Sequence, residues 1–169
     1  YPVLLNRTPY TVSPYGQNEY KKSLGNFPTM MREGYIFVYQ DVRGKWMSEG
    51  EFEDVRPTTY SKDKNAIDES TDTYDALEWL QKNLKNYNGK AGLYGISYPG
   101  FYSTVGLVKT HPSLKAVSPQ APVTDWYIGD DFHHNGVLFL QDAFTFMSTF
   151  GVPRPKPITP DQFKSKIQI

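Results

Sequence analysis

The chain has 169 residues, which is long enough for one domain with a substantial hydrophobic core. Lysine plus arginine and aspartate plus glutamate number 18 each, so the net charge is zero and the basic excess typical of nucleic-acid or membrane-surface binding is missing. The absence of cysteine excludes disulfides and thiolate metal sites. No apolar run approaches the roughly 20 residues of a membrane span. We therefore expect neither a nucleic-acid partner nor a membrane-spanning segment.

Strands and helices are predicted to alternate along the chain. Apolar runs rich in β-branched and aromatic residues predict strands at residues 3–6, 35–40, 91–94 and 114–118. Helical spacing and capping signals predict helices at residues 17–24, 28–33, 70–83 and 98–110. This alternation is typical of a parallel sheet covered on both faces, so the predicted fold class is α/β. Residues 125–150 break the alternation and are expected to form mainly helical decoration above the sheet.

The segment Gly95-Ile96-Ser97-Tyr98-Pro99-Gly100 is the most informative motif, because it joins a predicted strand to a predicted helix. A serine on such a sharp turn, with small residues around it, is the arrangement that exposes a nucleophilic hydroxyl in α/β-hydrolases. The N-terminus of the following helix would also direct backbone N–H groups towards a developing oxyanion. Pro99 stands at the last glycine position of the strict G-x-S-x-G pattern, so spacing alone leaves an ordinary tight turn as the alternative.

Further motifs follow one another in order along nearly the whole chain. They are Arg7-Thr8-Pro9-Tyr10, Gln40-Asp41-Val42-Arg43-Gly44, Ser48-Glu49-Gly50, Asp72-Thr73-Tyr74-Asp75 with Trp79-Leu80, and the turn at 95–100. In this series the chain resembles the CocE/NonD serine hydrolases, the family of cocaine esterase, X-Pro dipeptidyl peptidases and α-amino-acid ester hydrolases. The family's turn reads G-x-S-Y-x-G, which Pro99 and Gly100 fit. The resemblance implies an α/β-hydrolase fold and catalysis through an acyl-enzyme.

The resemblance also implies roles for individual residues. Ser97 is expected to be the nucleophile, with the backbone N–H of Tyr98 and the hydroxyl of Tyr10 forming the oxyanion hole. Residues 129–136, G-D-D-F-H-H-N-G, are similar to the G-D-D-W-F-H-Y-G segment of α-amino-acid ester hydrolases, which implies that Asp131 belongs to a carboxylate cluster binding a substrate's α-ammonium group. The expected substrates are small-molecule esters or amides of α-amino acids, including α-amino β-lactam antibiotics, and no cofactor is expected.

Other interpretations stay open at this stage. Without the family, the two acids and two histidines at 130–134 are typical of a solvated loop or a helix cap. A metal site built from them is disfavoured, because adjacent residues rarely converge on one ion. A cocaine-esterase-like or X-Pro-dipeptidyl-peptidase-like hydrolase is the alternative activity. A catalytically inactive relative that serves as a binding or scaffold domain is the alternative of another class.

The catalytic acid and histidine are not predicted within the chain. A hydrolase of this fold supplies them after the serine, in the order acid and then histidine. His111, His133 and His134 all follow Ser97 closely. His111 is expected to cap a helix end or lie at the surface, and the acid and histidine are expected beyond Ile169.

The chain is accordingly expected to be a fragment that is nearly inactive alone, because an alkyl hydroxyl without its base is a poor nucleophile. Residues 1–124 are expected to form the N-terminal half of the catalytic domain, and residues 125–169 the beginning of a helical cap. Relatives of this type are often exported and oligomeric, so the resemblance implies a periplasmic or secreted homo-oligomer.

Overall fold

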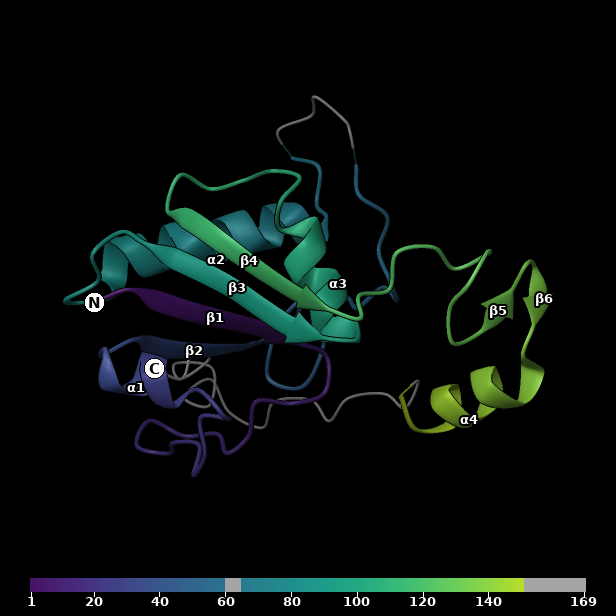
Figure 1. Ribbon diagram of the computed structural model, residues 1–169, viewed down its shortest axis with the longest axis horizontal. Helices are drawn as coiled ribbons and strands as arrows, with labels where there is room; N and C mark the ends of the chain where they lie inside the picture. Colours follow the sequence, from purple (N-terminus) through teal and green to yellow (C-terminus); the bar gives the residue numbers. More distant parts are fainter. Residues whose placement is uncertain (60–64, 151–169) are drawn as a thin grey trace.

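Four parallel strands form the central sheet in the computed structural model of the chain, which describes residues 1–59 and 65–150. The strands are β1 (Val3–Thr8), β2 (Ile36–Asp41), β3 (Ala91–Ile96) and β4 (Leu114–Gln120), in the spatial order β2-β1-β3-β4 (Figure 1). The helices are α1 (Pro28–Arg32), α2 (Glu69–Asn83), α3 (Tyr98–Val105) and α4 (Leu140–Phe150). Because all pairs are parallel, the loops that follow the strands meet at one edge of the sheet.

Alternate residues of β1 face opposite layers, as the period of a strand requires. Val3 and Leu5 pack with Leu77 of α2, and all three are buried. Leu4 faces the other side of the sheet, in a cluster that includes Met30 of α1. In Figure 1, α2 and α3 lie on one side of the sheet and α1 lies on the other. The predicted parallel sheet covered on both faces is therefore present.

The structure corrects two of the predicted helices. Residues 17–24 form no helix, because the segment lies between Gly16 and Gly25, which both have positive φ, and is too short to nucleate a helix without tertiary support. The helix predicted at 98–110 ends at Val105. Its last turn tightens into i+3 hydrogen bonds, such as that from the Leu107 N–H to the Thr104 carbonyl at 3.1 Å, and the helix does not continue.

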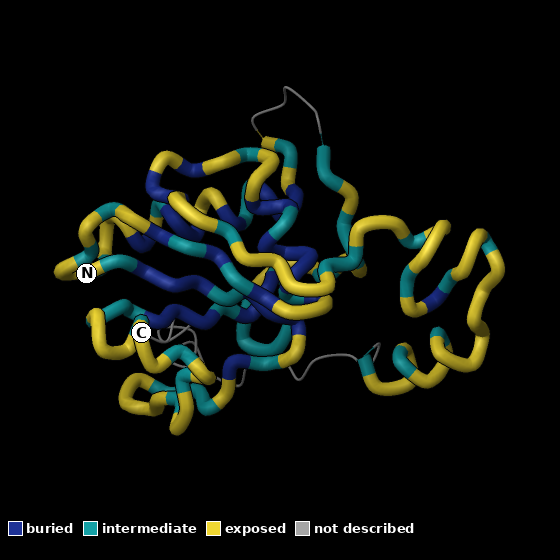
Figure 2. The backbone as a smooth tube through the Cα atoms, in the orientation of Figure 1, coloured by how far each residue is buried: buried dark blue, intermediate teal, exposed yellow. Residues whose placement is uncertain are grey.

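Residues 125–150 are less helical than predicted. They contain a short antiparallel hairpin of β5 (His133–His134) and β6 (Val137–Leu138), followed by α4. The turn Asn135-Gly136 has positive φ at both residues, the geometry that an Asn-Gly pair favours in a hairpin. This part is mostly exposed in Figure 2, and no residue of α4 is buried. The rest of the predicted cap, residues 151–169, lies outside the described residues.

Within the described ranges, no helix has both the length and the apolar character needed to cross a lipid bilayer. The longest helix, α2, carries charged side chains such as Glu69 and Asp72 in its first turn. Its buried stripe includes Ala76, Leu77 and Leu80, which face the sheet. The helix is therefore amphipathic and belongs to the layer that covers one face of the sheet.

The N-terminus of α2 depends on the buried carboxylate of Asp68, its N-cap residue. The carboxylate accepts hydrogen bonds from the N–H groups of Ser70 at 2.9 Å and Thr71 at 2.8 Å, and from the Thr59 hydroxyl at 2.9 Å. Lys109 Nζ lies 3.2 Å from the same group. Burial by itself would raise the pKa of Asp68, but the hydrogen bonds outweigh burial and hold this pKa well below its usual range.

The free energy of unfolding is therefore expected to decrease in acid. The unfolded carboxylate titrates near pH 4, and the folded one stays ionised to lower pH, so the unfolded state binds the proton first as pH falls. Asp68→Asn keeps a capping oxygen but loses the charge and the second acceptor oxygen that Thr59 and Lys109 contact. It should therefore lower the free energy of unfolding at neutral pH by about 1 to 2 kcal/mol and weaken the decrease of that free energy below about pH 4. Urea unfolding across this pH range measures both effects. Glu19→Gln, at an exposed acid, is the control; equal acid sensitivity of the two variants would contradict the prediction.

Candidate active site

Ser97 lies at the sharp turn between β3 and α3. Its backbone has φ 61° and ψ −122°, a conformation that L-residues other than glycine rarely adopt. Its N–H donates to the carbonyl of Gln120 in β4 at 2.9 Å, which holds the residue on the sheet. Ser97 is also exposed, at the edge where the strands end. Such strain costs about 1 to 3 kcal/mol and persists where the surroundings enforce it, often at a functional site.

Two glycines leave the space that this turn needs. A Cβ on Gly95 would lie 2.1 Å from the carbonyl oxygen of Pro99, and a Cβ on Gly100 would lie 2.7 Å from that of Gln120. Both obstacles are backbone atoms, so no side-chain rotation could relieve them. The second glycine stands at position 100 because this residue, and not Pro99, is where α3 presses against the end of β4.

Tyr98 and Tyr10, the residues predicted to supply the two oxyanion donors, contact each other through their rings. The N–H of Tyr98 is in the first turn of α3, where N–H groups have no acceptor within the helix. The rings of Tyr10 and Tyr98 meet edge to face with centroids 6.3 Å apart. Burial raises the pKa of the Tyr10 phenol, and the charges of Asp131 and Asp54 raise it further. The Tyr10 hydroxyl therefore keeps its proton at neutral pH and can donate a hydrogen bond.

Asp131 is exposed and lies just before the hairpin of β5 and β6. Its N–H donates to Oδ1 of Asp130 at 2.5 Å. Burial raises the pKa of Asp130, and the charge of Asp131 contributes to this rise. The neighbouring Phe132 is buried and packs on Trp126 at a centroid distance of 5.3 Å, which anchors the segment. Because the charge of Asp131 also acts on Tyr10, the carboxylate is within electrostatic range of that phenol.

None of the three histidines is hydrogen-bonded to Ser97 within the described part of the chain. The expectation of a surface position for His111 is wrong, because only 3% of this residue is exposed. Its Nδ1 lies 2.7 Å from Ser113 Oγ and its Nε2 lies 2.9 Å from Glu78 Oε2, so both ring nitrogens are engaged. His134 stacks with Phe139 in the hairpin segment. The base for Ser97 is thus not found among residues 1–59 and 65–150.

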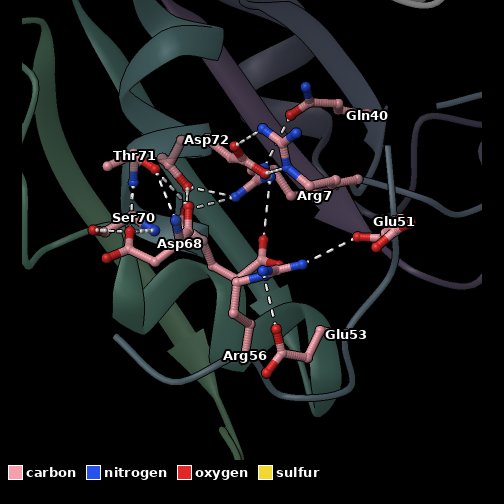
Figure 3. A network of polar contacts seen from close by, with 12 residues as sticks. Arg7, Gln40, Glu51, Glu53, Arg56, Asp68, Ser70, Thr71 and Asp72 are labelled. Atoms are coloured by element: carbon pink, nitrogen blue, oxygen red, sulfur yellow. Dashed lines mark hydrogen bonds and ion pairs between the residues drawn. The ribbon is translucent and has the colours of Figure 1, made fainter. Parts of the chain in front are cut away.

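A buried network around Arg7, drawn in Figure 3, was not foreseen from the sequence. Arg7 is 3% exposed, and its guanidinium donates to Gln40 Oε1 at 2.9 Å and to Thr73 Oγ1 at 2.7 Å. Asp72 lies 3.9 Å from the same guanidinium and is bound through both oxygens by Arg43. These residues all occur in the ordered motifs of the sequence, but only their three-dimensional arrangement shows that they are partners.

A cavity of about 500 Å³ lies beside this network and not at Ser97. Its lining includes Arg7, Arg43, Asp72 and Trp79, whereas Ser97, Tyr10 and Asp131 are not part of it. The strained serine, rather than the cavity, defines the candidate site, because Arg7 and Arg43 in the cavity wall are already paired with Asp72. In the described ranges, no cluster of three or more histidine, aspartate and glutamate side chains could hold a metal ion.

Comparison with known proteins agrees with this geometry. The sequence model of the X-Pro dipeptidyl-peptidase family, S15, matches residues 1–165. The chain belongs to the S15 family. Cocaine esterase from Rhodococcus sp. (strain MB1 Bresler) is 28% identical to this chain over 150 residues, which are 89% of this chain and 24% of that protein.

Two solved structures are similar in fold to this S15 chain. An α-amino acid ester hydrolase is 34% identical with a TM-score of 0.77, over 90% of this chain and 26% of that one. An aminopeptidase from the marine sediment archaeon Thaumarchaeota archaeon is 31% identical with a TM-score of 0.75, over 92% of this chain and 26% of that one. The predicted fold class and the predicted family are confirmed. The chain spans about a quarter of the length of these relatives.

Gly95→Ala is expected to lower the free energy of unfolding by about 2 to 3 kcal/mol, since the new Cβ overpacks against backbone. Urea unfolding measures the change. The matched control is Gly92→Ala in the same strand, where a Cβ would meet Leu4 Cδ1 at an ordinary 3.4 Å. Equal free energies of unfolding for the two variants would contradict the steric role of Gly95.

Proposed function

We propose that the chain forms the nucleophile-bearing part of a serine hydrolase that acts on esters or amides of α-amino acids. The observation that carries the proposal is the strained, exposed Ser97 at the β3–α3 turn, where Gly95 and Gly100 leave room for the backbone. Membership of the S15 family supports the same reaction class. We also propose that residues 1–124 belong to the catalytic domain and that residue 125 begins the cap.

The proposed reaction is acyl transfer in two stages. Ser97 Oγ attacks the substrate carbonyl while a base outside the described residues accepts its proton, and the leaving alcohol or amine departs from the tetrahedral intermediate. Water, or another amine, then attacks the acyl-enzyme and releases Ser97. The developing oxyanion would accept hydrogen bonds from the Tyr98 N–H and the Tyr10 hydroxyl, and each such donor is typically worth about 3 to 4 kcal/mol.

The proposed substrate class depends on Asp131. A carboxylate within electrostatic range of Tyr10 can pair with the α-ammonium group of a substrate whose carbonyl is held at Ser97. An α-amino acid ester hydrolase among the similar structures supports this class, to which we assign α-amino β-lactam antibiotics as amide substrates. An X-Pro dipeptidyl peptidase is the second candidate, because a peptide's N-terminal amine would use the same charge and the matching family is named for that activity.

The first test is Ser97→Ala in the complete enzyme. We expect at least a thousandfold loss of kcat/KM for ester hydrolysis, since removal of a serine nucleophile costs about this much or more. A fluorophosphonate should label the unaltered protein at Ser97 only. Ser118→Ala, at an exposed serine of β4, is the control. An unlabelled protein without Ser97-dependent hydrolysis would favour the binding or scaffold alternative.

The second test is Asp131→Asn. We expect kcat/KM for phenylglycine methyl ester, which carries a free α-amine, to fall at least about tenfold. The value of kcat/KM for p-nitrophenyl acetate, which has no amine, should change less than about twofold. Asp142→Asn, an exposed acid in α4, is the matched control. Equal losses of kcat/KM for both esters would show that Asp131 does not bind the substrate's ammonium group. Faster cleavage of an X-Pro anilide than of the amino-acid ester would favour the peptidase.

A further inference from the structure

The side chain of Tyr98 makes contacts that its proposed oxyanion role does not use. Its ring is buried, and its hydroxyl donates to Asp54 Oδ1 at 2.6 Å and accepts a hydrogen bond from the Val55 N–H at 2.8 Å. Asp54 precedes Tyr98 by 44 positions and belongs to the loop between β2 and α2. The residue after Ser97 is thus held at its backbone by α3 and at its phenol by a distant loop.

The loop is itself constrained where it meets this phenol. Val55 has φ 44°, which is a true outlier for a β-branched residue and is sustained only by its surroundings. Figure 3 shows Arg56 reaching back to two earlier positions of the loop: it binds Glu53 Oε2 at 2.9 Å and the Glu51 carbonyl at 3.1 Å. These contacts close the turn that presents Asp54 and the Val55 N–H to Tyr98.

The ring of Tyr98 connects this loop to the other oxyanion donor. It stacks on Tyr102 of α3 with centroids 5.1 Å apart and meets the edge of Tyr10 at 6.3 Å. A shift of the Tyr98 ring would therefore disturb the packing of Tyr10 and of the first turn of α3, which carry the two proposed donors. An oxyanion hole works because its donors are already in place when charge develops, so such shifts reduce the rate of the chemical step.

We propose that Asp54 is a positioning residue, which holds the Tyr98 hydroxyl and so fixes the geometry of both oxyanion donors. The proposal rests on the proposed function of Ser97. Asp54 holds the Tyr98 hydroxyl, its charge also contributes to the raised pKa of Tyr10, and it does not touch the reacting atoms. Burial, the neighbouring Tyr102 and the hydrogen bond to Asp54 all raise the pKa of Tyr98 far above its ordinary value, so the phenol keeps its proton and Asp54 is the acceptor.

The test compares four variants of the complete enzyme on p-nitrophenyl acetate. Asp54→Ala and Tyr98→Phe should each lower kcat about tenfold to a hundredfold with KM changed less than about twofold, because the lost alignment matters only in the transition state. Asp54→Asn keeps an acceptor oxygen and should restore kcat to within about threefold of the unaltered enzyme. Combining Asp54→Ala with Tyr98→Phe should cost no more than the worse single change, since each change removes the same hydrogen bond between Asp54 and Tyr98.

Glu51→Ala is the matched control, because Glu51 lies in the same loop and is exposed, and the alanine keeps the backbone carbonyl that accepts from Arg56. A kcat of Asp54→Ala within about twofold of this control overturns the proposal, and so does a loss confined to KM. If the alanine variant does not fold, Tyr98→Phe decides, because it keeps the ring packing and an unchanged kcat would overturn the proposal. Absence of Ser97-dependent hydrolysis in the unaltered enzyme would instead refute the proposed function.

Discussion

The arrangement around the candidate site depends on the buried guanidinium of Arg7. A buried charge is costly unless it is paired and hydrogen-bonded. The Arg7 guanidinium donates hydrogen bonds to partners in β2 and α2 and lies 3.4 Å from the Glu69 carboxylate. It lies near the end of β1, so its contacts determine where the chain leaves the sheet towards Tyr10. Through Asp72 the network also reaches Arg43, at the start of the loop that later supplies Asp54.

Steric exclusion acts at the second critical point, the turn that carries Ser97. A Cβ at Gly95 or Gly100 would collide with backbone atoms rather than with side chains, so the turn has little freedom to relax around a larger residue. The strained serine is therefore sustained by the sheet on one side and by α3 on the other. The ring of Tyr98 extends this rigidity to Tyr10 and to the β2–α2 loop. The ion pairs of the Arg7 network and the close packing at the Ser97 turn thus both hold the candidate site in one conformation.

Residues 125–150, which we propose begin the cap, contribute charge and aromatic surface rather than a buried core. Their helix α4 has no buried residue, yet Phe146 and Phe150 pack against the cluster that contains Tyr98. Lys45 Nζ lies 3.9 Å from the ring centroid of Phe150, a cation–π contact that joins α4 to the loop after β2. The carboxylate of Asp131 is carried by the same segment, which explains how a residue far from β1 in sequence can act electrostatically on Tyr10.

Features with local causes were predictable from the residues alone. The helix predicted at 70–83 is observed as Glu69–Asn83, because a capping aspartate and leucines at helical spacing lie within one short segment. The motif at 95–100 predicted the sharp turn at Ser97 that the structure has, since its glycines and serine lie within six residues of one another.

Tertiary structure alone decided the features whose partners are distant in sequence. Residues 17–24 have helical character but pack as a loop, and buried His111 is hydrogen-bonded to Glu78, 33 positions earlier. The contact between Asp54 and Tyr98 spans 44 positions and follows no periodic pattern. Hydrogen bonds and burial of this kind depend on how the sheet brings the loops together at one edge, and local propensity carries no information about that arrangement.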